Sequence, residues 1–323
     1  YFQGKKELFE GLAMEKLEKD WKEYPILHFD LNISQYDSPD SLYKILNDIL
    51  SRYEDEYGTR PSEVTLPLRF AGIIDRAYRK TGQRAVILID EYDKPLLQNL
   101  HDEEMQNRFR NMLKPFYGVL KTMDRAIRFA LLTGVTKFGK VSVFSDLNNL
   151  DDISMREPYA AICGITETEL RTHFDEDIHT LASALERTYE EARSLLRKRY
   201  DGYHFVAGGP GIYNPFSLLN AFATGRLDSY WFGSGTPTYL IEMLNKFGVL
   251  PSRIGGNEAV AADFDAPTER MQSVTPLLYQ SGYVTIKGYD EMFQIYTLDI
   301  PNAEVRIGLM RSLIPYYVTR DTQ

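Results

Sequence analysis

Cysteine is nearly absent from this sequence: Cys163 is the one thiol among 323 residues, so no disulfide can form within the chain. Because this cysteine lies in the apolar run YAAICGI, we expect a buried structural thiol rather than a nucleophile. No apolar run approaches the roughly 20 residues that a membrane-spanning helix needs, and no signal peptide is visible. The sequence therefore predicts a cytoplasmic protein with no membrane partner.

Several catalytic motifs are also missing. Serine hydrolases carry a GxSxG elbow and zinc proteases an HExxH helix, and neither pattern occurs. A net charge of -9 argues against extensive contact with nucleic acid, although a local basic patch could remain. The five histidines show no metal-ligand spacing: His28, His101, His173, His179 and His204.

The composition that is present is that of a globular protein. Hydrophobic residues make up 43% of the chain and charged residues 26%, as is typical of soluble folded domains. A length of 323 residues is enough for one large or two ordinary domains with a substantial core.

The stretch RAVILIDEYD, from Arg84 to Asp93, carries the clearest functional signal. Its apolar run, Ala85 to Ile89, predicts a strand that is buried on both faces, as in a parallel sheet. Asp90 and Glu91 follow at the carboxyl end of this strand, where α/β proteins bind their ligands. In a nucleoside triphosphatase, Asp90 would help to hold Mg²⁺ and Glu91 would polarise the attacking water. The alternative is a strand that ends in a solvated turn.

The rest of the first half predicts an α/β domain. Two further apolar runs end on polar residues: PILHFDLN ends its strand on Asp30, and IRFALLTG ends its strand on Thr133. Helical patterns separate the strands, so right-handed crossovers and a mainly parallel sheet are expected. The expected helical segments are Gly4 to Trp21, a helix capped by Ser38 or Asp40 that runs to about Tyr57, one from Pro61-Ser62 to Gly82, and Asp102 to Thr122 with a kink or interruption near Pro115.

The pattern becomes more helical after about residue 160. Thr166 and Glu169 stand in capping-box spacing at the start of a helical region that reaches Tyr200. YVTIKGY and MFQIYTL predict a β-hairpin. The other expected helices are one that starts at Pro215, Thr236 to Phe247, Pro267 to Gln280 and Pro301 to Tyr317. We predict two domains: residues 1–160 as an α/β core, and residues 161–323 as a helical lid followed by a winged-helix-like region.

A phosphate-binding loop of the GxxxxGK[ST] type is almost present in Gly134 to Val141, GVTKFGKV. Val141 replaces the hydroxyl residue that should meet Mg²⁺, and the following β-branched and aromatic residues are a poor helix start. The segment also follows the acidic strand, whereas a phosphate loop normally precedes it. We interpret it as a decoy.

A set of motifs, in this order, resembles the AAA-ATPase-like family of bacterial proteins. The motifs are YFQGKKELFEGL, YPILHFDLN, VILIDEYDKPL, LLTGVTKFGKVSVFSDLNNLDDIS, YAAICGITETEL, YDGYHF and YNPFSLLNAF. The likeness continues to LYQSGYVTIKGYD and IPNAEVRIGLMRSLIPYY, so it covers essentially the whole chain. Each motif is weak alone, and their order makes the resemblance strong.

The resemblance implies a P-loop ATPase fold that binds and hydrolyses ATP with Mg²⁺. Asp90, as metal ligand, and Glu91 would form the Walker B-like acidic pair, and Thr133 would be a sensor residue next to the γ-phosphate. In relatives the phosphate loop lies shortly upstream of the YFxGKKELF segment, with which this sequence starts. We therefore expect a sheet that lacks its Walker A strand, which is normally central, between the sensor strand and the last strand. Relatives also carry a downstream PD-(D/E)XK nuclease domain, which is missing here. ATP is expected to act in the complete protein and not to bind this chain tightly.

The alternative function is a non-catalytic regulatory module whose C-terminal region binds a protein or nucleic acid. Arg306, Arg311 and Arg320 give the last helix only a thin basic face for DNA. The motif YDGYHF contains His204, which we expect to be packed in a loop. Arg125, Arg128 and Arg156 are candidates for a charge-stabilising arginine, and we expect them at the surface. An aromatic cluster could line an adenine or peptide groove or pack in a core: Tyr203, Phe205, Tyr213 and Phe216 around Asn214.

Overall fold

The computed structural model describes most of the 323 residues; positions 137–142, 145–146, 234–237, 251–252, 265–272 and 319–323 lie outside the described part. The chain forms two compact units that divide between Leu150 and Asp151. This division comes slightly before the boundary predicted at residue 160. Each unit has its own hydrophobic core, because Leu27 and Leu147 belong to one cluster of buried side chains and Leu170 to another.

The first unit is built on a parallel sheet of three strands in the order β1-β2-β3. The strands are β1 (Ile26–Asp30), β2 (Ala85–Asp90) and β3 (Ile127–Leu132). The register places Asp30 beside Asp90 and Leu88 beside Leu131. The predicted α/β class with a parallel sheet is confirmed, and each strand lies in the stretch where the sequence predicts one.

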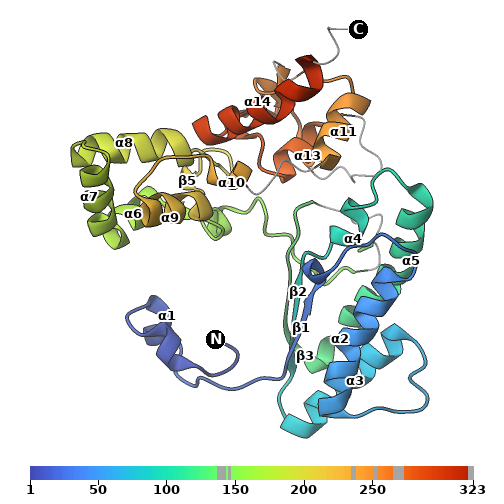
Figure 1. Ribbon diagram of the computed structural model, residues 1–323. Helices are drawn as coiled ribbons and strands as arrows, with labels where there is room; N and C mark the ends of the chain where they lie inside the picture. The colour runs from blue at the N-terminus through green and yellow to red at the C-terminus, as the bar shows by residue number, and fades with distance from the viewer. Residues whose placement is uncertain (137–142, 145–146, 234–237, 251–252, 265–272, 319–323) are drawn as a thin grey trace. The chain divides into compact units, whose positions relative to one another are not determined.

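Three long helices pack against one face of this sheet (Figure 1). They are α2 (Ser41–Tyr57), α3 (Leu66–Thr81) and α5 (Glu103–Thr122), and the short α4 (Lys94–Leu97) follows β2. The rings of Phe70 in α3 and Phe116 in α5 stack with their centroids 4.8 Å apart. Both rings also meet Phe29 of β1. Aromatic side chains therefore fill the space between the helices and the sheet.

Two helix predictions in this unit are corrected. The helix α3 begins at Leu66 instead of Pro61, because the hydroxyl of Thr65 accepts a hydrogen bond from the amide of Leu68 at 3.5 Å and caps the helix. The helix α5 runs through Pro115, so an interruption there is wrong, while the alternative of a kink stays a prediction. Pro115 faces solvent, where water can satisfy the Asn111 carbonyl that the proline leaves without a helical donor.

The N-terminal segment forms two short turns of helix, η1 (Lys6–Phe9) and α1 (Ala13–Leu17), in the region Gly4 to Trp21 where the sequence leans towards helix. Gly11, between them, has a φ of 78°, which breaks the helical path. The side chain of Leu17 is 75% exposed, so no core holds the segment in one longer helix.

The other face of β3 is open within the described part of the chain. Phe129 and Leu131 point away from the helices and are each 40% exposed, whereas Ala130 and Leu132 pack on the core. Phe2 covers part of this face, with its ring centroid 5.4 Å from that of Phe129. Among the described strands, β3 pairs with β2 alone. Parallel sheets usually have both faces covered, whereas this face of β3 is covered only in part within the described residues.

The second unit begins with four helices. They are α6 (Glu167–His173), α7 (Asp175–Ala184), α8 (Tyr189–Tyr200) and α9 (Pro215–Thr224). The predicted capping box is confirmed: the Thr166 hydroxyl accepts from the Glu169 amide at 3.2 Å, and the Glu169 carboxylate accepts from the Thr166 amide at 2.9 Å. Thr188 and Glu191 cap α8 in the same way.

The C-terminal part combines helices with a small antiparallel sheet. The helices are α10 (Tyr230–Gly233), α11 (Thr238–Lys246), α12 (Ala261–Phe264), α13 (Thr275–Gln280) and α14 (Ala303–Val318). The sheet has the order β6-β8-β7, with β6 (Asn257–Ala259), β7 (Thr285–Asp290) and β8 (Ile295–Asp299). The predicted hairpin is confirmed as β7 and β8, and β6 is an addition that the sequence did not indicate. The winged-helix likeness stays a prediction.

Cys163 is exposed, so the prediction of a buried thiol is wrong. The run YAAICGI forms turns after the short helix η4 (Glu157–Tyr159), and only Ala160 of its first residues is buried. Ile162 is 66% exposed in the same turns. An apolar run that folds as a turn has no single face to bury, so its composition does not predict burial. None of the helices in the described part is both long and apolar enough to cross a lipid bilayer.

Candidate functional site

Polar side chains gather at the carboxyl ends of the three parallel strands. Asp30 ends β1 beside Asp90, which ends β2, and Thr133 follows β3 directly. The backbone amide of Thr133 donates to the carbonyl of Ile89 at 2.9 Å and so extends the pairing of β2 with β3 by one residue. The hydroxyl of Thr133 donates to a carboxylate oxygen of Asp90. The structure thus brings together Asp90 and Thr133, two of the three residues that the sequence selects.

Glu91, the third selected residue, has an unusual backbone conformation. Its φ is 55°, in the left-handed region that few residues other than glycine adopt. The side chain is half-buried, and burial is the main cause that raises its pKa above the ordinary value; the nearby carboxylates of Asp93 and Asp90 raise it further. Strained backbone and a raised carboxyl pKa occur together at many catalytic sites.

A lysine near this end of the sheet already has partners. The ammonium group of Lys94 donates to the backbone carbonyl of Asn32 at 3.2 Å and also to the Asn32 side chain. The positive charge of Lys94 partly offsets the causes that raise the pKa of Glu91. Lys94 therefore ties the turn after β1 to the start of α4.

The described residues around this site offer few side chains that could bind a metal ion. Within the described part of the chain, no group of three or more His, Cys, Asp or Glu side chains is arranged to hold a metal ion. Asp90 is nevertheless exposed. This arrangement fits Mg²⁺, which is usually held by one or two carboxylates together with substrate phosphates and water.

The near match to a phosphate loop, Gly134 to Val141, falls mostly outside the described residues. Gly134, Val135 and Thr136 are described and form the loop after β3. Positions 137–141 are not described, so the interpretation of this segment as a decoy stays a prediction.

Asp93 and Thr136 are part of this site although the sequence did not single them out. Asp93 is fully buried and Thr136 is 2% exposed. The Asp93 carboxylate accepts hydrogen bonds from the amide and the hydroxyl of Thr136, at 2.5 and 2.8 Å. The only signal in the sequence was the second aspartate of DEYD. It was missed because a polar residue in a turn is usually solvated and because its contact with Thr136 spans 43 residues.

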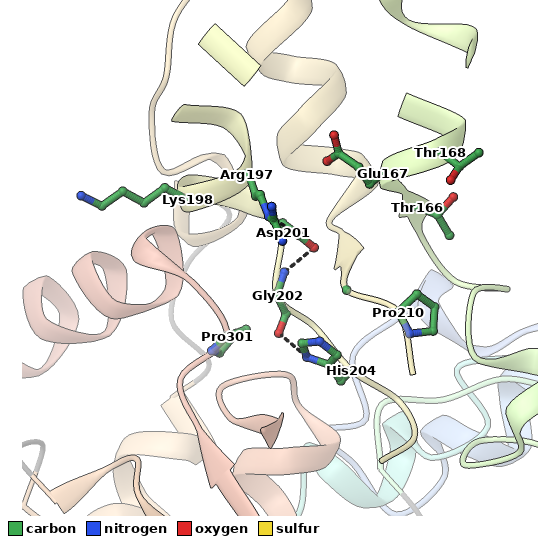
Figure 2. A pocket seen from close by; sticks show the side chains of 11 residues that line it. Thr166, Glu167, Thr168, Arg197, Lys198, Asp201, Gly202, His204, Pro210 and Pro301 are labelled. Carbon is green, nitrogen blue, oxygen red and sulfur yellow. Dashed lines mark hydrogen bonds and ion pairs between the residues drawn. The ribbon is translucent and has the colours of Figure 1, made fainter. Parts of the chain in front are cut away.

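The motif YDGYHF lines a polar cavity of about 420 Å³ in the second unit (Figure 2). His204 is half-buried, and its Nδ1 atom lies 3.0 Å from the carbonyl oxygen of Gly202. Burial, and then the charge of Lys287, lower the pKa of His204. Arg197 reaches towards the Asp201 carboxylate, at 3.6 Å. The other lining residues are Thr166, Glu167, Thr168, Lys198, Pro210, Gly211 and Pro301.

Three hydrogen bonds join the backbone of this motif to side chains of β7. The amide of His204 donates to the Thr285 hydroxyl at 2.8 Å, and that hydroxyl donates to the His204 carbonyl at 2.9 Å. The ammonium group of Lys287 donates to the Gly202 carbonyl at 2.7 Å. The histidine is therefore a loop residue packed against the small sheet, as its motif led us to expect.

The remaining candidates are dispersed. Tyr213 is fully buried and donates through its hydroxyl to Glu167 at 2.6 Å, whereas Phe216 is 54% exposed. These two aromatic residues therefore do not line one groove. The three candidate arginines, Arg125, Arg128 and Arg156, are exposed as expected. Arg156 forms an ion pair with Asp151.

Comparison with known proteins finds a family match and a relative that this chain matches over part of its length. Residues 1–144 match the AAA-ATPase-like family, whose description is "Predicted AAA-ATPase". The "Uncharacterized protein in vnfD 5'region" of Azotobacter chroococcum mcd 1 is 34% identical over an alignment of 323 positions that covers 98% of this chain. The chain spans 60% of the length of that relative. No solved structure matches the chain significantly. The resemblance seen in the sequence is confirmed for the first 144 residues.

Proposed function

We propose, because residues 1–144 belong to the AAA-ATPase-like family, that this chain supplies the acidic strand and the sensor residue of a Mg²⁺-dependent ATPase. ATP binds and is hydrolysed in the complete protein, and the chain with these residues alone binds ATP weakly. Asp90 holds Mg²⁺, Glu91 orients the attacking water, and Thr133 senses the γ-phosphate. When bound, Mg²⁺ neutralises charge on the phosphate oxygens.

The observation that carries this proposal is the bond from the Thr133 hydroxyl to the Asp90 carboxylate. It joins the ends of two neighbouring parallel strands, at the edge of the sheet where α/β proteins bind nucleotides. Glu91 directly follows Asp90, so a proposed metal ligand, a candidate base and a hydroxyl donor lie at the same end of the sheet. A solvated turn at the end of β2 has no need for this arrangement.

The environment of Glu91 supports its role as the water-orienting base. A carboxylate accepts a proton from water more readily when its pKa lies closer to the working pH. Burial and two neighbouring carboxylates raise the pKa of Glu91 in this direction. The left-handed backbone at Glu91 is a strained conformation of the kind that clusters at active sites.

The open side of β3 supports a phosphate loop supplied by another segment. Among the described strands β3 is paired on one edge only, and its other edge, with the exposed Phe129 and Leu131, offers pairing and an apolar surface to a further parallel strand and helix. A Walker A strand placed beside β3 lies next to the sensor strand, as the family resemblance implies. Its loop then reaches the carboxyl ends of β2 and β3, where Asp90 and Thr133 lie.

The test is ATP turnover by the full-length product of the gene, with Mg²⁺. We expect Glu91→Gln to reduce kcat by about 100-fold or more, which is the range of a general base. Glu104→Gln is the matched control, because Glu104 is an exposed carboxylate at the start of α5 and its loss removes the same charge. Equal turnover by the wild type and Glu91→Gln would remove Glu91 from the reaction.

A second function, binding through the C-terminal region, is favoured by the turn between β7 and β8. Met292 and Phe293 are 83% and 67% exposed there, and the Asp290 carboxylate accepts from both of their amides and so orders the turn. Two exposed apolar side chains on an ordered turn, beside Asp290 and Glu291, suit a protein partner better than a phosphate backbone. Arg306, from the proposed basic face, also lies 3.8 Å from Asp299.

This second function makes a prediction for nucleic acid. We expect the chain to show no salt-dependent binding of double-stranded DNA, even at low salt, because acidic side chains surround its most exposed apolar turn. Binding that weakens as salt rises would favour a winged-helix DNA module instead.

A further inference from the structure

The carboxylate of Asp93 binds the loop that follows β3. Its two oxygens accept three hydrogen bonds: from the amide of Val135 at 3.2 Å, from the amide of Thr136 at 2.5 Å, and from the hydroxyl of Thr136 at 2.8 Å. Asp93 has no exposed surface. All of these donors belong to one loop, and that loop starts at Thr133.

Tyr92 makes two further contacts with the same loop. Its amide donates to the carbonyl of Thr133 at 2.9 Å, and its hydroxyl donates to the carbonyl of Thr136 at 2.6 Å. Gly134 lies between them with no room for a side chain, since a Cβ atom there would come within 2.8 Å of the Tyr92 ring and would overlap the Asp93 carboxylate. The loops after β2 and β3 are thus in contact from Thr133 to Thr136.

We propose that Asp93 is a positioning residue, which holds the loop from Thr133 to Thr136 so that the Thr133 hydroxyl reaches Asp90. The proposal rests on the ATPase function proposed above and adds a residue that touches neither nucleotide nor water. Asp93 holds the far end of the loop, at Val135 and Thr136, whereas Thr133 is the end next to β3. When the far end is released, the bond between Thr133 and Asp90 loses its fixed geometry.

The test compares kinetic constants, because a purely structural residue and a positioning residue affect them differently. In the full-length gene product, Asp93→Asn replaces one acceptor oxygen with an amide group that faces the donors of Val135 and Thr136. We expect kcat to fall about tenfold and KM for ATP to change less than about threefold, since the loop affects the reaction and not the phosphate loop. Thr136→Val should lower kcat in the same direction, and Thr136→Ser should restore it because serine keeps the hydroxyl.

Asp102→Asn is the matched control. Asp102 also accepts from a backbone amide, that of Met105 at 2.9 Å, but it caps α5 away from the loop after β3. We expect this variant to melt at a slightly lower temperature, because the N-terminus of α5 loses a negative charge, with an unchanged kcat. If Asp93→Asn behaves in the same way, Asp93 is only structural and the proposal is overturned.

Hydrogen exchange separates this proposal from the ATPase function. In Asp93→Asn, the amides of Val135 and Thr136 should exchange faster than in the wild type, while the amide of Met105 should not. Unchanged exchange at Val135 and Thr136 would overturn the role of Asp93 whether or not ATP is hydrolysed. If Val135 and Thr136 exchange faster in Asp93→Asn but the wild-type protein hydrolyses no ATP, the loop contact is supported and only the proposed ATPase function is contradicted.

Discussion

The hydroxyl of Thr133 donates a hydrogen bond to the carboxylate of Asp90, although the two residues are 43 positions apart in the sequence. The bond crosses between neighbouring parallel strands at the point where both end. A hydroxyl can donate only one hydrogen bond, so in this arrangement the proton of the Thr133 hydroxyl is directed at Asp90.

The first prediction concerns this bond. In the full-length gene product, Thr133→Val keeps the size of the side chain but removes the donor, and we expect kcat for ATP to fall about tenfold or more. Thr133→Ser should keep most of the activity, because serine supplies the same hydroxyl. Steady-state turnover measures both. A Thr133→Val protein as active as the serine variant would show that the hydroxyl plays no part.

The second prediction concerns the glycine next to Thr133. Gly134→Ala places a Cβ atom against the Asp93 carboxylate and within 2.8 Å of the Tyr92 ring, so we expect a loss of about 1–3 kcal/mol of stability. Gly118→Ala is the control, because no atom lies within 4 Å of a Cβ at that position in α5. That variant should be neutral or up to about 1 kcal/mol more stable, since alanine favours helix. Urea unfolding of both variants measures the difference.

The third prediction concerns a nearly buried ion pair between α2 and α3. Arg69 donates to both carboxylate oxygens of Glu54 at 2.7 Å, with the side chains 13% and 11% exposed. The hydrogen bonds from Arg69 are the main cause that lowers the pKa of Glu54. Glu54→Gln should therefore cost about 2 kcal/mol at pH 7.

The pH dependence of this third effect has a definite sign. A lowered pKa in the folded state means that the pair stabilises the protein above the ordinary glutamate pKa of 4.5, and that this contribution disappears as the pH falls through the lower, folded value. The stability difference between the wild type and Glu54→Gln should shrink accordingly in acid. A difference that stays constant down to pH 3 would contradict the ion-pair explanation.

The fourth prediction concerns a buried carboxylate in the second unit. Glu304 has no exposed surface and accepts from the Ser217 hydroxyl at 3.0 Å and from the Trp231 amide at 2.9 Å. Burial raises its pKa, and these two bonds offset the rise only in part. Wild-type stability should therefore decrease, relative to Glu304→Gln, as the pH rises above the ordinary value of 4.5.

We expect this difference in stability to grow steadily as the pH rises from 4.5 towards neutral. Trp231 lies at the site, so urea unfolding followed by tryptophan fluorescence at several pH values is a suitable measurement. Parallel stability curves for the two proteins would mean that Glu304 does not change its charge in this range.

The fifth prediction concerns Cys163. Because its side chain is exposed, a thiol reagent should label the folded protein at one site, at a rate close to that of the unfolded chain. Cys163→Ser should abolish labelling and change stability by less than about 0.5 kcal/mol, as surface substitutions usually do. Labelling that required denaturant would restore the buried thiol that the sequence suggested.

Local patterns in the sequence predicted most elements of this fold, because each of them depends on neighbouring residues. The apolar run before Asp90 gives β2, and the spacing of Thr166 and Glu169 gives the start of α6. The helix α3 started later than expected because Thr65 competes with Pro61 as a helix start, and only the geometry of the cap decides between them.

The site was predicted only in part, for a reason that lies in long-range contacts. Asp90, Glu91 and Thr133 stand out because they follow apolar strands. Asp93 does not, because its burial depends on Thr136, and no pattern near Asp93 encodes that contact. The prediction of a buried thiol at Cys163 was wrong for the opposite reason. Its apolar neighbours suggested a core, but the run folds as a turn.

The links between YDGYHF and the C-terminal sheet also set an order of events during synthesis. His204 must wait for Thr285, which is 81 residues later, and Ser217 must wait for Glu304, which is 87 residues later. At translation rates of about 5–20 residues per second, the delay is roughly 4–16 seconds. The helices α6 to α9 emerge from the ribosome during that time without the partners that complete their packing. A nascent chain stalled before Thr285 would therefore hold an unfinished second unit, open to chaperones and proteases.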